Sequence, residues 1–475
     1  MIKKLLSHTA LYGIAPQLPK VANILVLPII TKYLTEEDYG VAGLVGAYTT
    51  ALEVLQSLGI AVILTNSFHK YPTTYPWLWR QLHGFISLWS IPYGLILSVI
   101  LYFGIPEEAY ENRGWIILLN VIPSAFFATT QLIVFRYYQM SERPQPLAVR
   151  SVVLGILTVA LNLYFIAELR LGYMGWFLST FISSLLNFII FGYLIYFKVG
   201  MTPIFNFKWR TIRQSLKVSL PVVPHYYAGY LLNSSDRLVM DWLNVGTGRL
   251  GLYNFAGNFG SYFSALGNAV GMATSPTYIG LYKQGEHDPT AFEKARFLTF
   301  LVQGAFLVGS FLLCLWLREI FFLLVSNEDL RSVYPLAIII IMGYAYRPMY
   351  LGVSTLLFYH ERTTRLWRIS LVAGALNVAS NVLLIPFFGF QAAAFTTFFA
   401  LMYMGYSGYF MKDYQELRQL NYYPIRWLLA TIGVAAGSYF LRDIDLLYKV
   451  GISLALCAGG GRYFFKSDFR TLLKG

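Results

Sequence analysis

The chain has 475 residues, of which 57% are hydrophobic and only 12% are charged. Ordinary soluble domains are about 25% charged, so this composition excludes a chain made of soluble domains alone. The net charge of +13 would indicate a nucleic-acid partner in a soluble protein. Apolar stretches of about 18 residues or more instead recur along the chain, and each can cross a lipid bilayer. The sequence therefore predicts an all-α polytopic membrane protein, and no nucleic-acid partner is expected.

The hydrophobic pattern predicts about 14 transmembrane helices. The windows are 9–31, 41–65, 84–105, 114–135, 149–168, 173–197, 218–240, 250–279, 295–317, 333–357, 366–386, 388–411, 425–441 and 446–463. The last two are short, so the alternative count is about twelve. The first window begins like a secretory signal, but Pro16, Pro19 and Lys20 interrupt it and no Ala-x-Ala cleavage site follows. We therefore assign it to the first spanning helix.

The distribution of basic residues predicts the orientation. With both termini on one side, 25 of the 36 Lys and Arg lie on that side and nine on the other. Because loops rich in Lys and Arg stay in the cytoplasm, both termini are expected to be cytoplasmic. Acidic clusters such as Glu36-Glu37-Asp38 and Glu107-Glu108 fall in the opposite loops. Most of the +13 charge is therefore an orientation signal facing anionic lipid.

The sequence contains an internal repeat. An offset of 219 residues pairs Glu142-Arg143 with Glu361-Arg362, Ser151 with Ser370, Gly155 with Gly374 and Asn162 with Asn381, and an offset of 205 pairs Pro16-x-x-Pro19 with Pro221-x-x-Pro224. Six spans per half make the two halves parallel repeats. We predict two pseudo-symmetric six-helix lobes around a central cavity, at 1–198 and 217–411. A cytoplasmic amphipathic linker at 199–216 joins them, and 412–475 holds helices 13 and 14 and a basic cytoplasmic tail.

Two features of this organisation have alternative interpretations. The linker alternates basic with apolar residues, as an interfacial helix does, but a solvated basic loop has similar composition. The paired prolines at matching places in the two halves predict bends that act as hinges in the first and seventh spans. Prolines are also common in membrane helices, where they shape packing.

A few ionisable side chains fall inside predicted spans, where each costs about 2.5–3.5 kcal/mol unless it faces a cavity or a partner. They are Lys20, Glu53, His225 and Arg347. Lys20 and Arg347, from different halves, are predicted to bind a diphosphate or acidic sugar in a shared cavity, with His225 as a further candidate. Glu53 is the candidate for coupling to H⁺ or Na⁺. Alternatively, the cations snorkel or pair with Glu53.

Amides in or beside the spans are numerous, with several tyrosines nearby. The amides are Asn23, Gln56, Asn66, Asn120, Gln131, Asn162, Asn187, Asn233, Asn254, Asn258, Asn268, Gln303, Asn377, Asn381 and Gln391, and the tyrosines are Tyr226, Tyr227, Tyr230, Tyr253 and Tyr262. Amides and aromatic faces suit sugar binding, although most such amides in membranes form interhelical hydrogen bonds worth about 0.6 kcal/mol.

Catalytic and cofactor motifs are not recognisable in the sequence. Cys314 and Cys457 are the only cysteines and lie in apolar segments, so no disulfide framework or Cys-based metal site is expected. No Walker loop is found, so ATP is not the expected direct energy source. We predict a protein that is not an enzyme and binds neither a metal nor a cofactor.

Several short motifs together resemble one known family. Leu34-Thr35-Glu36-Glu37-Asp38-Tyr39-Gly40 follows the first span, Ser219-Leu220-Pro221-Val222-Val223-Pro224 opens the second half, and Ser235-Asp236-Arg237-Leu238 and Gly251-Leu252-Tyr253-Asn254-Phe255-Ala256 follow it. In combination they are similar to the polysaccharide transporter (Wzx-type flippase) family of the multidrug/oligosaccharidyl-lipid/polysaccharide (MOP) exporters. Thr35 and Asn254 depart from that family's usual Gly and Ser. By this resemblance Pro221, Pro224, Asp236 and Arg237 are expected to have structural roles, and a local ion pair fixing a helix end is expected of Asp236 and Arg237.

This resemblance implies a flippase that moves undecaprenyl-diphosphate-linked oligosaccharide units across a bacterial inner membrane for O-antigen, capsule or exopolysaccharide assembly. It also implies alternating access of two lobes, and as partners the lipid-linked oligosaccharide, membrane lipids, and a polysaccharide polymerase with its chain-length regulator. The alternatives are a lipid II flippase and a MATE-like drug/cation antiporter, which would favour carboxylates over cations in its cavity. A non-transporting scaffold for glycan assembly is a further alternative, against which the polar residues in the spans argue.

Overall fold

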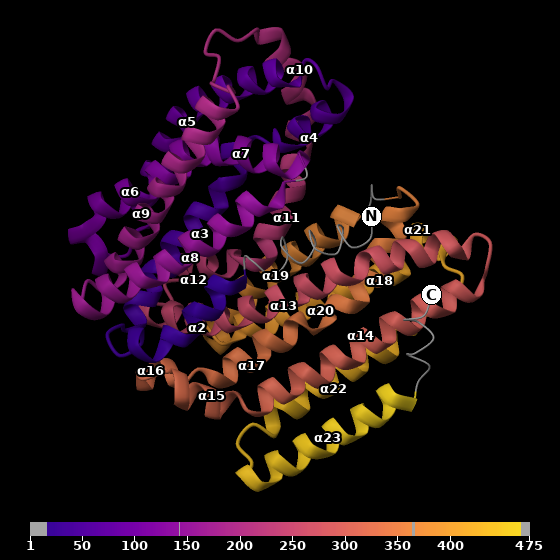
Figure 1. Ribbon diagram of the computed structural model, residues 1–475. Coiled ribbons are helices and arrows are strands. Elements are labelled where there is room, and N and C mark those ends of the chain that lie inside the picture. Colours follow the sequence, from indigo (N-terminus) through magenta and orange to yellow (C-terminus); the bar gives the residue numbers. More distant parts are fainter. Residues whose placement is uncertain (1–16, 142, 363–365, 467–475) are drawn as a thin grey trace. The chain divides into compact units, whose positions relative to one another are not determined.

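The computed structural model describes residues 17–141, 143–362 and 366–466, and in these ranges the chain is helical, without a β-strand (Figure 1). The predicted all-α class is confirmed. Some predictions lie outside the described residues: the first part of the first span with Pro16, the repeat residue Glu142, and the tail beyond Lys466. The helices form two compact units, described separately below.

Unit 1 comprises the described residues up to Asn254 together with Val325–Leu330. Its helices are α2 (Leu18–Ile30), α3 (Glu36–Ser57), α4 (Ala61–Lys70), α5 (Tyr75–Gly104), α6 (Arg113–Ile122), α7 (Ala128–Met140), α8 (Pro144–Asn162), α9 (Tyr173–Gly192), α10 (Trp209–Ser219), α11 (Val223–Asn233), α12 (Ser235–Trp242), the first turns of α13 (Thr247–Gly285), and most of α16 (Glu328–Arg331). Wider π-helical turns at Pro123–Phe127, Leu163–Glu168 and Tyr193–Lys198 continue α6, α8 and α9.

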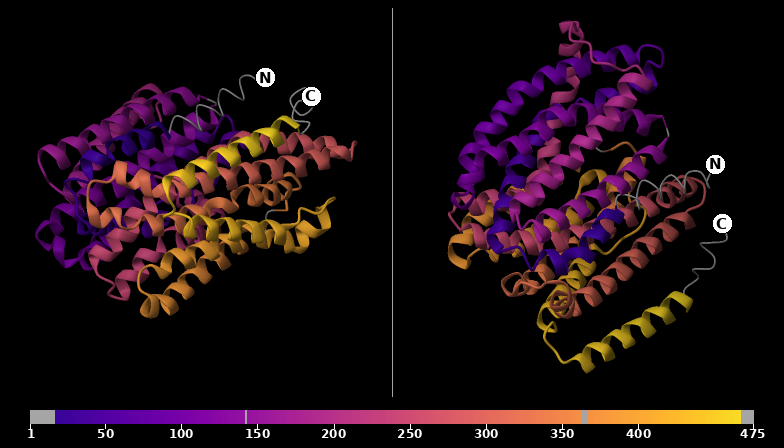
Figure 2. Two further views of the ribbon diagram at one scale, coloured as in Figure 1. Left: turned by 90° about the horizontal axis from the view of Figure 1, so that it is seen from below. Right: turned by 60° about the vertical axis from the view of Figure 1, so that its left-hand side comes forward.

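Unit 2 comprises Phe255–Leu324 and the described residues from Arg331 onward. Besides the rest of α13, it holds α14 (Thr290–Leu315), α15 (Leu317–Leu324), α17 (Tyr334–Gly343), α18 (Arg347–Tyr359), α19 (Leu366–Phe388), α20 (Ala392–Tyr406), α21 (Lys412–Leu417), α22 (Pro424–Phe440) and α23 (Leu446–Lys466). Within this unit α23 lies at the margin, in contact with α14 (Figure 2). The two compact units divide after Asn254, whereas the predicted sequence repeats divide at the linker 199–216. The repeat stays a prediction.

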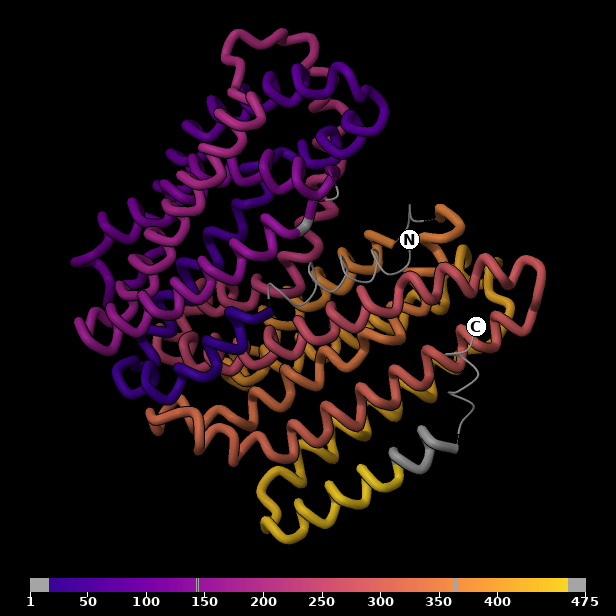
Figure 3. Tube along the Cα trace, viewed as in Figure 1, coloured from indigo at the N-terminus to yellow at the C-terminus, as the bar shows by residue number. Residues whose placement is uncertain are grey.

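Every predicted window is occupied by helix in the described residues, and the Cα trace joins these helices by short connections (Figure 3). Eight helical segments are long and apolar enough to cross a membrane, judged by length and composition. They are Glu36–Lys70, Tyr75–Gly104, Glu107–Met140, Gln145–Glu168, Tyr173–Lys198, Thr290–Leu315, Tyr334–Tyr359 and Leu366–Phe388. The remaining windows hold helices that are shorter, broken or rich in polar residues. The chain is a multi-pass membrane protein.

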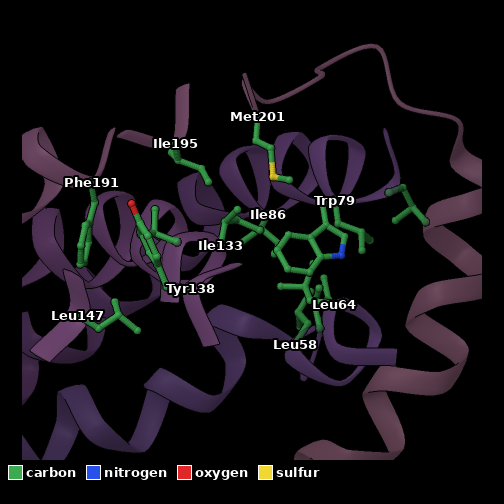
Figure 4. Close-up of a cluster of buried hydrophobic side chains, with 14 residues drawn as sticks. Leu58, Leu64, Trp79, Ile86, Ile133, Tyr138, Leu147, Phe191, Ile195 and Met201 are labelled. Carbon is green, nitrogen blue, oxygen red and sulfur yellow. The ribbon is translucent and has the colours of Figure 1, made fainter. Parts of the chain in front are cut away.

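Buried apolar side chains of α4, α5, α7, α8 and α9 form one core of unit 1. Trp79 is fully buried in this cluster, and its indole nitrogen donates to Ser67 Oγ at 3.0 Å. Tyr138, Leu147 and Phe191 lie together at one side of this cluster (Figure 4). Close packing of these side chains holds the helices of the unit together. Leu147 and Phe191 of this cluster also line the site described below.

The segment between α9 and α10 is attached to the start of α5. Ile204 donates its backbone N–H to the carbonyl of Arg80, and the Arg80 side chain donates to the Thr202 carbonyl at 2.8 Å. Met201 and Ile212 of the predicted linker are buried in the core cluster. The apolar face of α10 therefore packs on unit 1 itself.

Prolines coincide with breaks in two predicted spans. A 3₁₀ turn at Leu220–Val222 separates α10 from α11, with Pro221 inside the turn and Pro224 in the first turn of α11. A second 3₁₀ turn at Tyr344–Tyr346 separates α17 from α18, and Pro348 is the second residue of α18. Proline lacks the N–H that would continue the helical ladder, which explains why the regular helix is interrupted here.

Candidate functional site

A cavity of about 970 Å³ opens within unit 1 among α3, α7, α8, α9 and α11. The lining residues recur at helical spacing, so each helix contributes one face. They include Thr50, Glu53, Val54 and Ser57 of α3; Gln131, Leu132, Phe135 and Arg136 of α7; Leu147, Arg150, Ser151 and Leu154 of α8; Asn187 and Phe191 of α9; and Tyr226, Gly229, Tyr230 and Asn233 of α11. The wall combines two arginines, one carboxylate, several amides and aromatic rings.

Arg150 projects from α8 onto the aromatic side of the core cluster. Its guanidinium carbon lies 4.9 Å from the centre of the Phe191 ring and 5.9 Å from that of Tyr138, which are cation–π distances. The Nη1 atom is buried and has no hydrogen-bond partner in the described part of the chain. The rings therefore hold Arg150 in place while one of its donors stays unsatisfied.

Arg136 is the second cation of the cavity. Its Nη1 donates to Gln139 Oε1 at 2.8 Å, a contact three residues along the same helix. Its Nε is buried without a hydrogen-bond partner among the described residues. The Gln139 contact orients the guanidinium, and the Nε donor remains available.

Two further lining residues have the same property. Gln56 Nε2 and the Tyr230 hydroxyl are buried and lack hydrogen-bond partners in the ranges described. Leaving a buried donor unsatisfied costs about 1–3 kcal/mol, and more for a charged group. Four such groups around one cavity indicate a ligand rich in acceptor oxygens. Phosphate and sugar oxygens meet that requirement, and arginine forms its strongest hydrogen bonds with phosphate.

Glu53 supplies the negative charge of the cavity. It is exposed on α3, one helical turn before Gln56 and Ser57. With Arg136 and Arg150 opposite a single carboxylate, the lining carries a net formal charge of about +1 at neutral pH. A net positive lining favours an anionic ligand, while the carboxylate offers a group that can take up a proton.

Comparison with known proteins places the chain in a family. The profile described as "Polysaccharide biosynthesis protein" matches residues 5–279, more than half of the sequence. The chain belongs to this family. A search of curated proteins found no match.

Solved structures share the fold at low sequence identity. A lipid II flippase, MurJ, in an inward closed conformation matches with a TM-score of 0.66 at 13% identity, over 94% of this chain and 100% of that one. A multidrug resistance MATE family transporter of the MOP superfamily matches with a TM-score of 0.58 at 14% identity, over 90% and 98%. A MATE transporter of Vibrio cholerae matches with a TM-score of 0.53 at 15% identity, over 89% and 98%. The predicted MOP flippase fold is confirmed.

The motifs that indicated the polysaccharide biosynthesis family have defined contacts in unit 1. Asp236 accepts a hydrogen bond from the Tyr253 hydroxyl, and Arg237 donates through Nε to Asn254 Oδ1 at 2.8 Å. The Asn254 amide also donates to the carbonyl of Tyr39 at 3.1 Å. Asn254, where the family usually has Ser, thus connects α12 to the start of α3. The predicted ion pair of Asp236 and Arg237 stays a prediction.

The acidic motif after the first span organises another junction. Asp38 Oδ2 accepts from the backbone N–H of Thr35 at 2.8 Å and closes a capping box at the start of α3. Its Oδ1 accepts from the N–H of Tyr173 at 2.7 Å. Gly172 precedes that residue with φ of 53°, a left-handed conformation that glycine adopts without strain. One carboxylate therefore fixes the starts of both α3 and α9.

The structure places the predicted cavity cations as follows. Lys20 is exposed on α2, where the neighbouring Pro19 packs so closely on α8 that a Cβ on Gly155 would lie 2.2 Å from it. His225 is exposed on α11, directly before the cavity-lining Tyr226. Neither Lys20 nor His225 lines the cavity of unit 1. Glu53 does line it.

Arg347 lies in unit 2, at the break between α17 and α18. Its Nη2 donates to Ser264 Oγ at 2.8 Å, and its Nη1 donates to Asn268 Oδ1. Its Nε is buried without a hydrogen-bond partner among the described residues. Both terminal nitrogens therefore have partners on α13.

Arg136 and Arg150 are functional candidates that sequence reasoning assigned only to the orientation signal. Both stand at the edges of hydrophobic windows, where positive charge ordinarily marks the cytoplasmic side. One signal was present in the sequence: Leu147, Arg150, Ser151 and Leu154 follow the i, i+3, i+4, i+7 pattern of one helix face.

Of the amides identified in the sequence, Gln56, Gln131, Asn187 and Asn233 line the cavity. The described residues contain no cluster of three or more side chains that could hold a metal ion.

Proposed function

We propose that the protein is a flippase for undecaprenyl-diphosphate-linked oligosaccharide units in a bacterial inner membrane, with both termini cytoplasmic. The observation that carries the proposal is the set of buried donors around the cavity of unit 1, two of them on arginines, that lack acceptors. A diphosphate supplies acceptor oxygens for Arg136 and Arg150. Gln56, Gln131, Asn187 and the tyrosines can then receive sugar hydroxyls.

Transport follows from alternating access, with the cargo bound while the cavity faces one side of the membrane and released at the other. A flippase of this kind does no bond-breaking chemistry and therefore is not an enzyme.

Glu53 can couple the transport cycle to H⁺ or Na⁺, since its carboxylate lies in the same cavity as Arg136 and Arg150. We retain Lys20, His225 and Arg347 as proposed cargo-binding residues and expect their alanine variants to lower glycan export. A polysaccharide polymerase and its chain-length regulator are the proposed partners at the outer face.

The test is complementation of a deletion strain of the native host. We compare the wild-type gene with the double variant Arg136→Gln and Arg150→Gln, and with Arg210→Gln and Arg213→Gln as a control that removes the same charge. Arg210 and Arg213 are exposed on α10 and do not line the cavity. Losing charge-assisted hydrogen bonds of about 1.5–3 kcal/mol each lowers surface glycan about tenfold or more.

Undecaprenyl-diphosphate-linked intermediates should accumulate inside cells that carry the cavity variant, at unchanged protein level. Normal surface glycan from that variant would overturn the cavity assignment. Growth arrest with loss of peptidoglycan in the deletion strain would instead assign lipid II as cargo. Hypersensitivity to cationic drugs with normal glycan would assign a drug antiporter.

A further inference from the structure

A second cavity, of about 250 Å³, lies in unit 2 at the start of α22. It is lined by the segment that connects α20 to α22, including Tyr414, Arg418, Tyr422 and Arg426. Its volume exceeds that of several water molecules, each of which occupies about 30 Å³. No acidic side chain occurs among its lining residues, all of which lie in the described part of the chain. The cavity is therefore small, polar and positively charged.

Three packed tyrosines, Tyr409, Tyr414 and Tyr422, form the floor of this cavity. The Tyr409 hydroxyl donates to the Met349 carbonyl at 2.8 Å, and the Tyr409 ring packs against Tyr414 and Tyr422 at centroid distances of 5.0 and 5.9 Å. Tyr422 also packs on Phe300 of α14 at 6.1 Å. Contacts with α14 and α18 therefore hold the floor in one arrangement.

Tyr414 carries an unused donor. Its side chain is 1% exposed and lines the cavity, and its hydroxyl has no hydrogen-bond partner in the described residues. Burial raises the pKa of Tyr414, so the hydroxyl stays protonated at physiological pH. A buried O–H without an acceptor is unfavourable. It indicates a ligand that brings one.

Two arginines stand around the cavity without carboxylate partners. Arg418 and Arg426 are exposed, and neither forms an ion pair within the described ranges. The nearby Glu416 is already paired with Arg362 at 2.5 Å and lies 4.0 Å from Lys412. The Arg426 guanidinium lies 4.7 Å from the Tyr423 ring centre, a cation–π contact that positions it.

The start of α22 adds backbone donors. The helix begins at Pro424, and the amides of Ile425 and Arg426 in its first turn have no acceptor within the helix. A helix of 17 residues also presents the positive end of its dipole here. These donors, the Tyr414 hydroxyl and both guanidinium groups surround the same small cavity.

We propose that this cavity of unit 2 is a phosphate-binding site, separate from the cargo cavity of unit 1. The group bound is a phosphate ester or free phosphate, held by Arg418, Arg426, the Tyr414 hydroxyl and the first amides of α22. The headgroup of an anionic phospholipid is the favoured source. Phe410, Tyr423 and Ile425 line the cavity and are 59%, 39% and 58% exposed, so apolar surface for the glycerol and acyl region adjoins the cations.

The test measures thermal stabilisation and native mass spectra of the full-length protein in detergent with added phosphatidylglycerol. The variants are Tyr414→Phe and the double variant Arg418→Gln with Arg426→Gln. The control is Arg210→Gln with Arg213→Gln, which removes the same charge from exposed positions of α10. We expect the arginine variant to bind phosphatidylglycerol about tenfold more weakly and the control to bind as the wild type does.

Tyr414→Phe separates binding from folding. Without lipid it should be at least as stable as the wild type, because it removes an unsatisfied buried hydroxyl. With phosphatidylglycerol it should lose most of the stabilisation. Full lipid-dependent stabilisation of both site variants would overturn the proposal, as would an equal loss in the α10 control. Equal stabilisation of the wild type by inorganic phosphate, abolished in the site variants, would support the phosphate site and assign it to a soluble ligand.

Discussion

Equivalent positions of the two sequence halves have opposite environments. At the predicted offset of 219 residues, Arg150 corresponds to Ile369 and Arg136 to Thr355. Both arginines line the cavity of unit 1, whereas Ile369 and Thr355 are each only 5% exposed in the packed interior of unit 2. The same helical pattern therefore supports a polar cavity in one half and a closed core in the other.

Arg347 of unit 2 and Arg150 of unit 1 also differ in their surroundings. Arg347 in unit 2 donates to Ser264 and Asn268, so its charge is dispersed over side chains of its own unit. Arg150 in unit 1 has aromatic neighbours and an unsatisfied Nη1 in the described part of the chain. Each residue keeps one buried nitrogen without a hydrogen-bond partner among the described residues, Nε in Arg347 and Nη1 in Arg150. They differ in their neighbours, which are hydrogen-bond acceptors for Arg347 and aromatic rings for Arg150. Arg150 also shares its cavity with other unsatisfied donors, which makes the unit 1 cavity the stronger candidate.

Ile369→Arg should have the largest effect. The substitution places in unit 2 the charge that unit 1 carries at the corresponding position, but without a cavity to receive it. An unpaired buried charge costs about 3–5 kcal/mol, so we expect loss of the monodisperse protein in detergent size-exclusion chromatography. Ile369→Val, which costs about 0.5–1.5 kcal/mol, is the control. A folded Ile369→Arg protein would show that unit 2 can open a cavity like that of unit 1.

Arg150→Ile is the reciprocal change and should abolish function while preserving the fold. Glycan export should fall about tenfold or more, because a charge-assisted hydrogen bond to the cargo is lost. The thermal midpoint should not decrease, because the removed guanidinium has an unsatisfied nitrogen. Surface glycan and the thermal midpoint are measured on the same preparation. A large decrease in the midpoint would mean that Arg150 stabilises the fold instead of binding the cargo.

A smaller difference is expected between Asn381 and Asn162, which are equivalent at the same offset. Asn381 of α19 accepts from the Thr396 hydroxyl of α20 and donates to Asn377 one turn earlier on its own helix. Asn162 Oδ1 is buried without a partner in the described residues. Asn381→Leu should lower the free energy of unfolding by about 1 kcal/mol. Asn162→Leu should change it by less than about 0.5 kcal/mol. Thermal unfolding of the two variants in one detergent checks the order, and equal losses would contradict it.

The last comparison concerns helix starts. Asp38→Ala removes a cap of α3 and the bond to Tyr173, and should cost about 1–2 kcal/mol. Asp288→Ala is the matched control in unit 2, since the Asp288 carboxylate accepts hydrogen bonds from the backbone N–H and the hydroxyl of Thr290 at the start of α14. Those hydrogen bonds lower the pKa of Asp288.

The stabilisation by Asp288 is therefore present at neutral pH and lost as the pH falls through the lowered pKa. The difference in thermal midpoint between wild type and Asp288→Ala should shrink toward acid pH. A difference that grew on acidification would contradict this assignment. A loss in Asp38→Ala no greater than that in Asp288→Ala would contradict the cross-helix role of Asp38.

Much of the fold was predictable because hydrophobic length is a local property. Each window of about 18 apolar residues must form helix in lipid, since no other regular structure in such a segment satisfies its own backbone. The π-helical turns and the division of unit 1 from unit 2 inside α13 were not predictable. Both depend on which helices pack against each other. No local sequence pattern shows that.

The cavity was only partly predictable. Glu53 was recognised because a carboxylate in a span is costly, and it does line the cavity. Arg136 and Arg150 stand at span edges, where the orientation rule already accounts for a positive charge. Lys20 and His225 are inside predicted spans yet lie on exposed helix surfaces. Position along the chain therefore identifies costly charges but does not show which of them share a cavity.

The sequence by itself determined the all-helical membrane class, the family through its motifs, and the predicted orientation through its basic residues. Each depends on local composition or short motifs. Only the tertiary structure decided that Arg136, Arg150, Gln56 and Tyr230 face one cavity with donors unsatisfied, and that Arg347 is held by Ser264 and Asn268. Whether such a donor has a partner depends on side chains from other helices, so it is decided only when the helices pack.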